Sequence, residues 1–243
     1  LDHLLKSCED APMRIVAVPG FTQSALAWQP VQTANPDLDI IALDVPTQRT
    51  FADTSRAIGE AGGSAIYLGY SMGGRLCLQL AIDQPDLFDG LVLVSSSPGI
   101  VEAEERAARL EKDQALAARI DEIGVEEFLT EWLAQPMFAS LTSEQSQYAE
   151  RVAANTVYGL HHQLVALGQG AQPSLWDSLC TLEMPVMLLT GDGDSKYDEI
   201  AEQMFEEIPD CIRLQIPGGH ALPLENPAGV AEALETFIAD LSL

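Results

Sequence analysis

Basic residues are scarce in this chain of 243 residues. It contains 12 Lys and Arg against 37 Asp and Glu, which gives a formal net charge of −25 at pH 7. Because nucleic acids and anionic membranes are bound through basic surface, we expect neither as a partner. The scarcity also gives weight to any basic residues that gather around a pocket, since few are available for the rest of the surface.

Long apolar runs and closely spaced metal ligands are missing as well. No segment approaches the roughly 20 apolar residues of a membrane-spanning helix, and no charged-then-apolar leader opens the sequence. The four cysteines lie far apart, with no CxxC pair and no histidine at metal-ligand spacing. We therefore expect a cytoplasmic protein without a metal site, in which Cys77 and Cys211 are small buried residues.

Short apolar runs alternate with helical segments along the chain. Such runs are typical of strands buried on both faces, and their alternation with helices predicts an α/β fold with a mostly parallel central sheet flanked by helices. The length favours a single domain over residues 1–243. The predicted strands lie at 14–18, 39–44, 65–68, 91–94, 184–190 and 212–216, and predicted helices include 52–61, 196–207 and 227–241.

The alternation stops at about residue 100, where a block without strands begins. We expect this insertion, at about 100–175, to form a helical lid over the strand ends, which is where ligands bind in α/β folds. Ordinary cover for the sheet is the alternative, but the length of the block favours the lid. Its predicted helices lie at 102–123, 126–133, 143–154 and 158–167, the third with a capping residue at Ser143.

A Gly-x-Ser-x-Gly motif follows the third predicted strand. Residues 69–73 read Gly-Tyr-Ser-Met-Gly and stand between that strand and a helix. The pattern is typical of a nucleophile elbow, in which the serine occupies a strained turn with its hydroxyl exposed. Glycines are needed at both ends because side chains there would collide with neighbouring backbone. An incidental serine in a glycine-rich turn is the alternative.

A histidine and an acid that could activate Ser71 follow later strands. A serine hydroxyl needs a histidine to take its proton, and that histidine needs a carboxylate to orient it. Among the four histidines, His220 alone follows a predicted strand. Asp194 and Asp192 both follow the strand before it, and we favour Asp194, three residues past Gly191. The order serine, aspartate, histidine agrees with the elbow architecture.

An oxyanion hole requires two backbone N–H groups near the serine. Met72, directly after Ser71, is predicted to supply one of them. Phe21, in the loop after the first strand, is predicted to supply the other. Both assignments rest on position, because any residue except proline could donate there.

Four stretches carry a family resemblance: Gly-Tyr-Ser-Met-Gly-Gly-Arg at 69–75, Gln-Pro-Met-Phe-Ala-Ser at 135–140, Gly-Ala-Gln-Pro-Ser-Leu-Trp at 170–176 and Leu-Glu-Asn-Pro at 224–227. Over nearly its full length the chain resembles the α/β-hydrolase superfamily. Within that superfamily it is most similar to the 2-succinyl-6-hydroxy-2,4-cyclohexadiene-1-carboxylate (SHCHC) synthases of menaquinone biosynthesis. The elbow is common to the superfamily, whereas the two lid stretches are much more discriminating.

The resemblance implies a triad that abstracts a proton rather than hydrolysing an ester. In the synthase family, a cyclohexene that carries succinyl, carboxyl and enolpyruvyl groups loses pyruvate. By this resemblance Ser71, activated by His220 and Asp194, removes a ring proton, and the N–H groups of Phe21 and Met72 stabilise the developing charge. No cofactor is implied, and the expected partner is a small anionic substrate.

A substrate with several carboxylates calls for cations, preferably the bidentate guanidinium of arginine. Two of the matching residues have alternatives: Arg75 could form an ion pair on a helix surface, and Trp132 could belong to the lid core. The residues that match substrate-binding positions of the family are Tyr70, Arg75, Arg109, Trp132, Arg151 and Lys196.

Three departures from the family pattern concern the substrate. Pro19-Gly20 replaces the usual His-Gly of the oxyanion loop, residues 45–49 replace a usual Pro-Gly-His-Gly, and Pro223 stands where another histidine often occurs. The first two alter the pocket mouth, so a relative with a changed substrate is one alternative. A hydrolase of small esters or carbon–carbon bonds, with Ser71 as covalent nucleophile, is a second. A non-catalytic ligand receptor is a third, which the complete Ser-Asp-His set disfavours.

Overall fold

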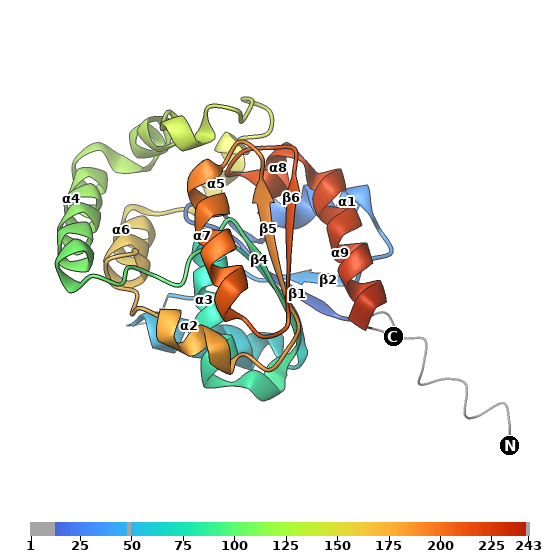
Figure 1. Cartoon of the computed structure of the whole chain (residues 1–243). Coiled ribbons are helices and arrows are strands. Elements are labelled where there is room, and N and C mark those ends of the chain that lie inside the picture. Colours follow the sequence, from blue (N-terminus) through green and yellow to red (C-terminus); the bar gives the residue numbers. More distant parts are fainter. Residues whose placement is uncertain (1–12, 48–49, 242–243) are drawn as a thin grey trace, which may run out of the picture.

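The structure is a computed structural model that describes residues 13–47 and 50–241. The terminal His3 and Cys8, and Gln48-Arg49 of the altered loop, lie outside the described residues. The core of the described chain is one parallel sheet with helices on both faces (Figure 1).

The sheet has the strand order β2-β1-β3-β4-β5-β6, and every pairing is parallel. Its register places Val18 beside Gly69 and Tyr70 beside Val94, so the carboxyl ends of the central strands meet at one edge. The predicted α/β class and mostly parallel sheet are confirmed. The strands are β1 (Ile15–Val18), β2 (Ile40–Ala42), β3 (Ala65–Tyr70), β4 (Phe88–Val94), β5 (Val186–Gly191) and β6 (Cys211–Ile216).

Alternate residues of the strands face two separate cores. Val16 and Val18 face the helices α2, α3 and α7, whereas Ile15 and Ala17 face α1 and α9. Burial of both faces explains why the strands are continuously apolar in sequence. The helices are α1 (Gln29–Ala34), α2 (Phe51–Gly62), α3 (Met72–Asp83), α4 (Ala103–Leu133), α5 (Tyr148–Ala154), α6 (Val157–Leu167), α7 (Ser195–Glu207), α8 (Leu222–Glu225) and α9 (Pro227–Leu241). Short 3₁₀ turns cover Ala25–Trp28, Pro85–Leu87, Pro136–Phe138 and Trp176–Thr181.

The insertion between β4 and β5 contains α4, α5 and α6. Helices α4 and α6 pack together around a small core of their own, which includes Ile120, Phe128 and Leu160, and they stand apart from the sheet in Figure 1. The two ends of the insertion meet, because the Leu175 N–H donates to the Pro98 carbonyl at 2.7 Å.

The helices of the insertion agree with the sequence prediction in one respect and differ in another. The helices predicted at 102–123 and 126–133 are both present within α4, separated by a kink at Gly124 (φ 78°, ψ 179°), a conformation that only glycine adopts readily. The third helix begins at Tyr148 rather than at 143. Thr142 Oγ1 instead accepts a hydrogen bond from the Gln145 N–H in a separate turn.

Among the residues that the structure describes, no helix combines the length and the apolar character required to cross a bilayer. Cys77 is fully buried in the core, as expected, whereas Cys211 at the start of β6 is only partly buried. The edge strand β6 is more exposed than the other strands, which accounts for the difference.

Candidate active site

Ser71 occupies the sharp turn between β3 and α3. Its backbone has a positive φ of 50° with ψ −109°, a strained conformation for a residue with a side chain. The flanking glycines make the turn sterically feasible. A Cβ at Gly69 would lie 2.4 Å from the Gly74 Cα, and one at Gly73 would lie 2.2 Å from the Val18 carbonyl oxygen. The geometry is that of a nucleophile elbow.

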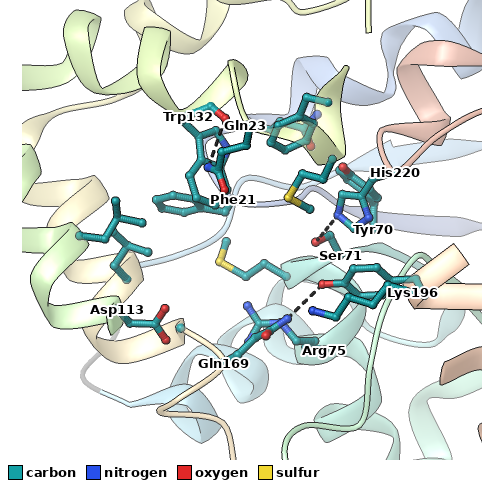
Figure 2. A pocket seen from close by; sticks show the side chains of 18 of the residues that line it. Phe21, Gln23, Tyr70, Ser71, Arg75, Asp113, Trp132, Gln169, Lys196 and His220 are labelled. Atoms are coloured by element: carbon teal, nitrogen blue, oxygen red, sulfur yellow. Dashed lines mark hydrogen bonds between the residues drawn. The ribbon is translucent and has the colours of Figure 1, made fainter. Parts of the chain in front are cut away.

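Ser71, His220 and Asp194 form a hydrogen-bonded row at the carboxyl ends of the strands. The Ser71 Oγ lies 3.2 Å from His220 Nε2, the contact drawn in Figure 2, and His220 Nδ1 lies 2.8 Å from Asp194 Oδ2. Because the carboxylate can only accept, it holds the hydrogen on Nδ1 and leaves Nε2 able to take a proton from the serine. His220 and Asp194 are only 2 % and 8 % exposed, so water competes little for these bonds.

Asp192, the alternative acid, makes a different contact. Its Oδ1 accepts a hydrogen bond from the Gly218 N–H at 3.0 Å and braces the loop that leads to His220. Asp194 is the aspartate that reaches the histidine.

The two residues predicted to form the oxyanion hole both line the cavity that contains Ser71. Met72 is the first residue of α3, so its N–H has no acceptor within the helix. Phe21 lies in the loop after β1, and its ring packs edge-on against Trp132, with the ring centroids 5.0 Å apart. The adjacent Gly20 N–H donates to Gln23 Oε1 at 3.0 Å.

The cavity around Ser71 has a volume of about 690 Å³ and lies between the strand ends and the insertion. Figure 2 shows Arg75 and Lys196 on the side of this cavity that also holds Gln169, and Phe21 and Trp132 on another. All six residues that were predicted to bind substrate line this cavity. Four of them are basic, and Lys112 of α4 is a fifth basic residue in the lining.

Arg75 is buried rather than paired on a helix surface, which rules out the first alternative. Only 6 % of it is exposed. Its guanidinium donates to Gln172 Oε1 at 3.2 Å and lies 5.8 Å from the centroid of the Phe51 ring. Desolvation lowers the pKa of Arg75 to about 10, so it remains cationic at neutral pH. No carboxylate hydrogen-bonds to Arg75 within the described chain, which suits a cation reserved for an anionic ligand.

Arg109 and Arg151 both belong to the insertion, and hydrogen bonds hold each of them in place. Arg109 Nε donates to the buried Asp113 at 2.8 Å, and its Nη1 contacts Gln169. Arg151 donates to the Ser146 carbonyl at 2.8 Å and also contacts the Thr22 hydroxyl. Burial lowers the pKa of Arg151 to about 10. These contacts fix where the two guanidinium groups lie.

Aromatic rings complete the wall around His220. The Tyr197 and Tyr70 rings lie with their centroids 4.5 Å and 5.5 Å from that of His220, and burial raises the pKa of both phenols, so both stay neutral. Lys196 Nζ is 5.4 Å from the Tyr197 centroid. Trp132 packs on Phe21, Phe128 and Phe138, so it contributes both to the core of the insertion and to the cavity wall.

Several residues of the site were missed by the sequence prediction. Glu225 accepts from the N–H groups of Gly219 and Ala221, on either side of His220. It belongs to the 224–227 stretch that the sequence singled out, which was the available signal. Gln172 similarly belongs to the 170–176 stretch. Nothing in the sequence indicated Gln23 or Asp113.

The described residues contain no group of three or more His, Cys, Asp or Glu side chains that is placed to hold a metal ion. The chemistry that the cavity offers comes from one serine–histidine–aspartate row and a surrounding set of cations.

These features together define an α/β-hydrolase fold. The strands are parallel and in this order, a serine lies on a strained strand-to-helix turn, and an acid and a histidine follow later strands. The family model described as "Alpha/beta hydrolase family" matches residues 15–233, and the chain belongs to this family.

Several individual proteins are similar to this chain in sequence or in structure. The chain is 30 % identical to the SHCHC synthase of Citrobacter koseri, with 92 % of this chain and 93 % of that protein covered. It is 29 % identical to a putative SHCHC synthase of Bacillus subtilis, over 96 % and 92 % of the two chains. The structure of MenH from S. aureus has a TM-score of 0.89 and 25 % identity, with 96 % of both chains covered. A thermophilic esterase from Thermogutta terrifontis has a TM-score of 0.81 at 20 % identity, covering 96 % of this chain and 92 % of that one, which shows a shared fold.

Proposed function

We propose that this protein is an SHCHC synthase, a lyase that eliminates pyruvate from an enolpyruvyl succinyl-cyclohexene carboxylate in menaquinone biosynthesis. One observation carries the proposal beyond the family resemblance. Five of the chain's 12 basic residues line the cavity that holds Ser71. In a protein of net charge −25, such a concentration of cations favours a substrate with several carboxylates over a neutral ester.

The proposed mechanism uses Ser71 as a base relay. The Ser71 Oγ takes a proton from a ring carbon while its own proton moves to His220 Nε2. The C–H electron pair moves into the ring as the C–O bond to the enolpyruvyl group breaks, and the leaving enolate becomes pyruvate on receiving a proton from His220. Asp194 stabilises the imidazolium between these steps.

The remaining roles follow from position in the cavity. The N–H groups of Phe21 and Met72 stabilise the charge that develops on the substrate. The basic residues, with the hydroxyl of Tyr70 and the ring of Trp132, hold and orient its carboxylates and ring. This mechanism requires no cofactor. The charge of the protein supports neither nucleic acid nor an anionic membrane as a partner. Because the described cysteines are free thiols, we place the protein in the cytoplasm.

Pyruvate release from the enolpyruvyl substrate tests the proposal directly. We expect the wild type to release pyruvate and Ser71→Ala to lose about 10²- to 10⁴-fold in kcat, the usual range for a positioned base. Replacement of His161, a partly exposed histidine of α6 paired with Asp121, by alanine is the matched control and should leave the rate unchanged.

The hydrolase alternative makes an opposite prediction for the same proteins. A serine hydrolase would turn over nitrophenyl acetate with a burst of acyl-enzyme and release no pyruvate. That result would overturn the synthase proposal. A ligand receptor would bind the substrate equally well with and without Ser71 and turn over neither compound.

A further inference from the structure

The amide oxygen of Gln23 accepts a hydrogen bond, whereas its amide nitrogen has no partner. Its Oε1 accepts a hydrogen bond from the Gly20 N–H at 3.0 Å. Because a backbone N–H can only donate, this contact identifies the accepting atom as the oxygen and the opposite atom as the NH₂ group. That Nε2 is buried and has no acceptor among the described residues.

A buried donor without a partner lowers the stability of the fold, so its position can indicate where a ligand binds. Leaving such a group unsatisfied costs about 1–3 kcal/mol. Gln23 is 7 % exposed and lines the cavity, and Figure 2 shows it beside Phe21. Nε2 itself has almost no accessible surface, and because the side chain lines the cavity, we expect a small rotation of its amide to present this donor to a ligand oxygen there.

Unpaired polar atoms are concentrated among the residues around this cavity. Seven buried side-chain atoms of the described residues have no partner, and three of them belong to residues that line it. Two are donors, Gln23 Nε2 and Trp132 Nε1, and one is an acceptor, Gln163 Oε1. The two donors are complementary to a ligand with acceptor oxygens, as the cations beside them are.

We propose that Gln23 is a substrate-binding residue whose Nε2 donates a hydrogen bond to an anionic oxygen of the substrate, next to the oxyanion position at Phe21. The same side chain anchors the oxyanion loop through Gly20, so one glutamine both shapes the loop and contacts the ligand. This inference rests on the proposed function, because it deepens the account of how that anionic substrate is held.

The alternative is that Gln23 only anchors the loop, and two variants separate the roles. Gln23→Glu keeps an acceptor for the Gly20 N–H but removes the donor. Gln23→Met has a similar shape and removes both. An anchoring role alone predicts that only Gln23→Met is impaired. A donor role predicts that both are impaired and that the Gln23 side-chain amide signal shifts on binding, whereas anchoring combined with charge repulsion by the glutamate would leave that signal unchanged.

The probe is 2-succinylbenzoate, an unreactive aromatic that carries a ring carboxylate and a succinyl group. We expect calorimetry to show that both variants bind it about 10- to 100-fold more weakly than the wild type, the effect of one lost hydrogen bond to a charged group. Weaker binding in Gln23→Met alone, in Gln23→Glu alone (simple charge repulsion) or in neither would overturn the inference. So would a wild type that does not bind the probe.

Two further measurements keep folding and the proposed function separate from this result. In isotope-labelled wild type, the side-chain amide signal of Gln23, assigned by its absence in Gln23→Glu, should shift when the probe is added. An unchanged signal would contradict the inference even if a variant misfolds. Pyruvate release is assayed in parallel. Weaker probe binding in both variants of a protein that releases no pyruvate would support the donor and overturn only the synthase proposal.

Discussion

Among single residues, Glu225 illustrates how a group outside the cavity can control one inside it. Its carboxylate accepts from the Gly219 N–H at 2.7 Å and from the Ala221 N–H at 3.0 Å. These two peptide groups flank His220, so the carboxylate fixes the backbone that carries the imidazole. Glu225 is not itself among the residues that line the cavity. It is therefore a positioning residue.

Replacing Glu225 should affect turnover more than binding. In Glu225→Ala both N–H groups lose their acceptor, and we expect kcat for pyruvate release to fall about 10- to 100-fold, since small misplacements of a reacting group cost about that much. KM should change little. Glu225→Gln keeps one accepting oxygen and should retain intermediate activity. Steady-state kinetics on both variants check this, and a rise in KM at constant kcat would contradict the positioning role.

The sequence allowed the members of the hydrogen-bonded row to be predicted because each follows a predicted strand in a recognisable turn. Ser71 and His220 needed only that argument. Asp194 was favoured over Asp192 from its position three residues past Gly191, and it is Asp194 whose carboxylate contacts the imidazole, whereas Asp192 contacts the Gly218 N–H. The contact between Arg151 and Thr22 joins residues far apart in the chain, so no local pattern could have indicated it.

At the scale of elements, α5 and the loop after β1 act as one unit. Thr22 has a positive φ of 71° and is completely buried. Asn155, at the end of α5, donates to its carbonyl at 2.7 Å, and Arg151 contacts its hydroxyl. A strained residue next to Phe21 is thus held by the insertion, which links the lid to the proposed oxyanion hole.

Weakening this link should impair turnover from a distance. We expect Asn155→Ala to lower kcat about tenfold, because the Phe21 N–H is then less firmly placed. Thr156→Ala is the matched control, since Thr156 caps α6 through the Gly159 N–H and does not bond to the loop. The two variants are compared in the pyruvate assay after their unfolding temperatures are measured. Equal losses in both would indicate a general effect on the lid.

Element boundaries show where sequence reasoning succeeds and fails. The strands were found because burial on both faces makes them continuously apolar. The third lid helix was placed too early, because a Thr-Ser-Glu sequence that looks like a helix start closes a separate turn through Thr142 and Gln145. Polar caps of turns and of helices use the same side-chain contacts, so sequence alone does not distinguish them.

At the scale of the whole molecule, the net charge opposes compactness. With 37 acidic and 12 basic residues, most surface carboxylates lack a basic partner and repel one another. The cations that could reduce this repulsion are partly withdrawn into the cavity. With these cations in the cavity, more of the repulsion at the surface remains uncompensated.

Screening of this repulsion should stabilise the fold. We expect the unfolding temperature at pH 7 to rise by a few degrees between about 10 mM and 0.5 M NaCl, because the Debye length falls from roughly 30 Å to a few ångströms. The same salt series near the isoelectric point, about pH 4.1, is the control and should show a much smaller rise. An unfolding temperature that is flat or falls at pH 7 would contradict this account.

The hydrogen bond from Leu175 to Pro98 has a consequence for how such proteins diversify. Since the insertion leaves and re-enters the sheet at one point, its length and sequence can change without moving a strand. Ser71, Asp194 and His220 all lie outside it, whereas Arg109, Trp132 and Arg151 lie within it. Changes in this one continuous segment can therefore alter which ligand the cavity accepts, while Ser71, Asp194 and His220 stay unchanged.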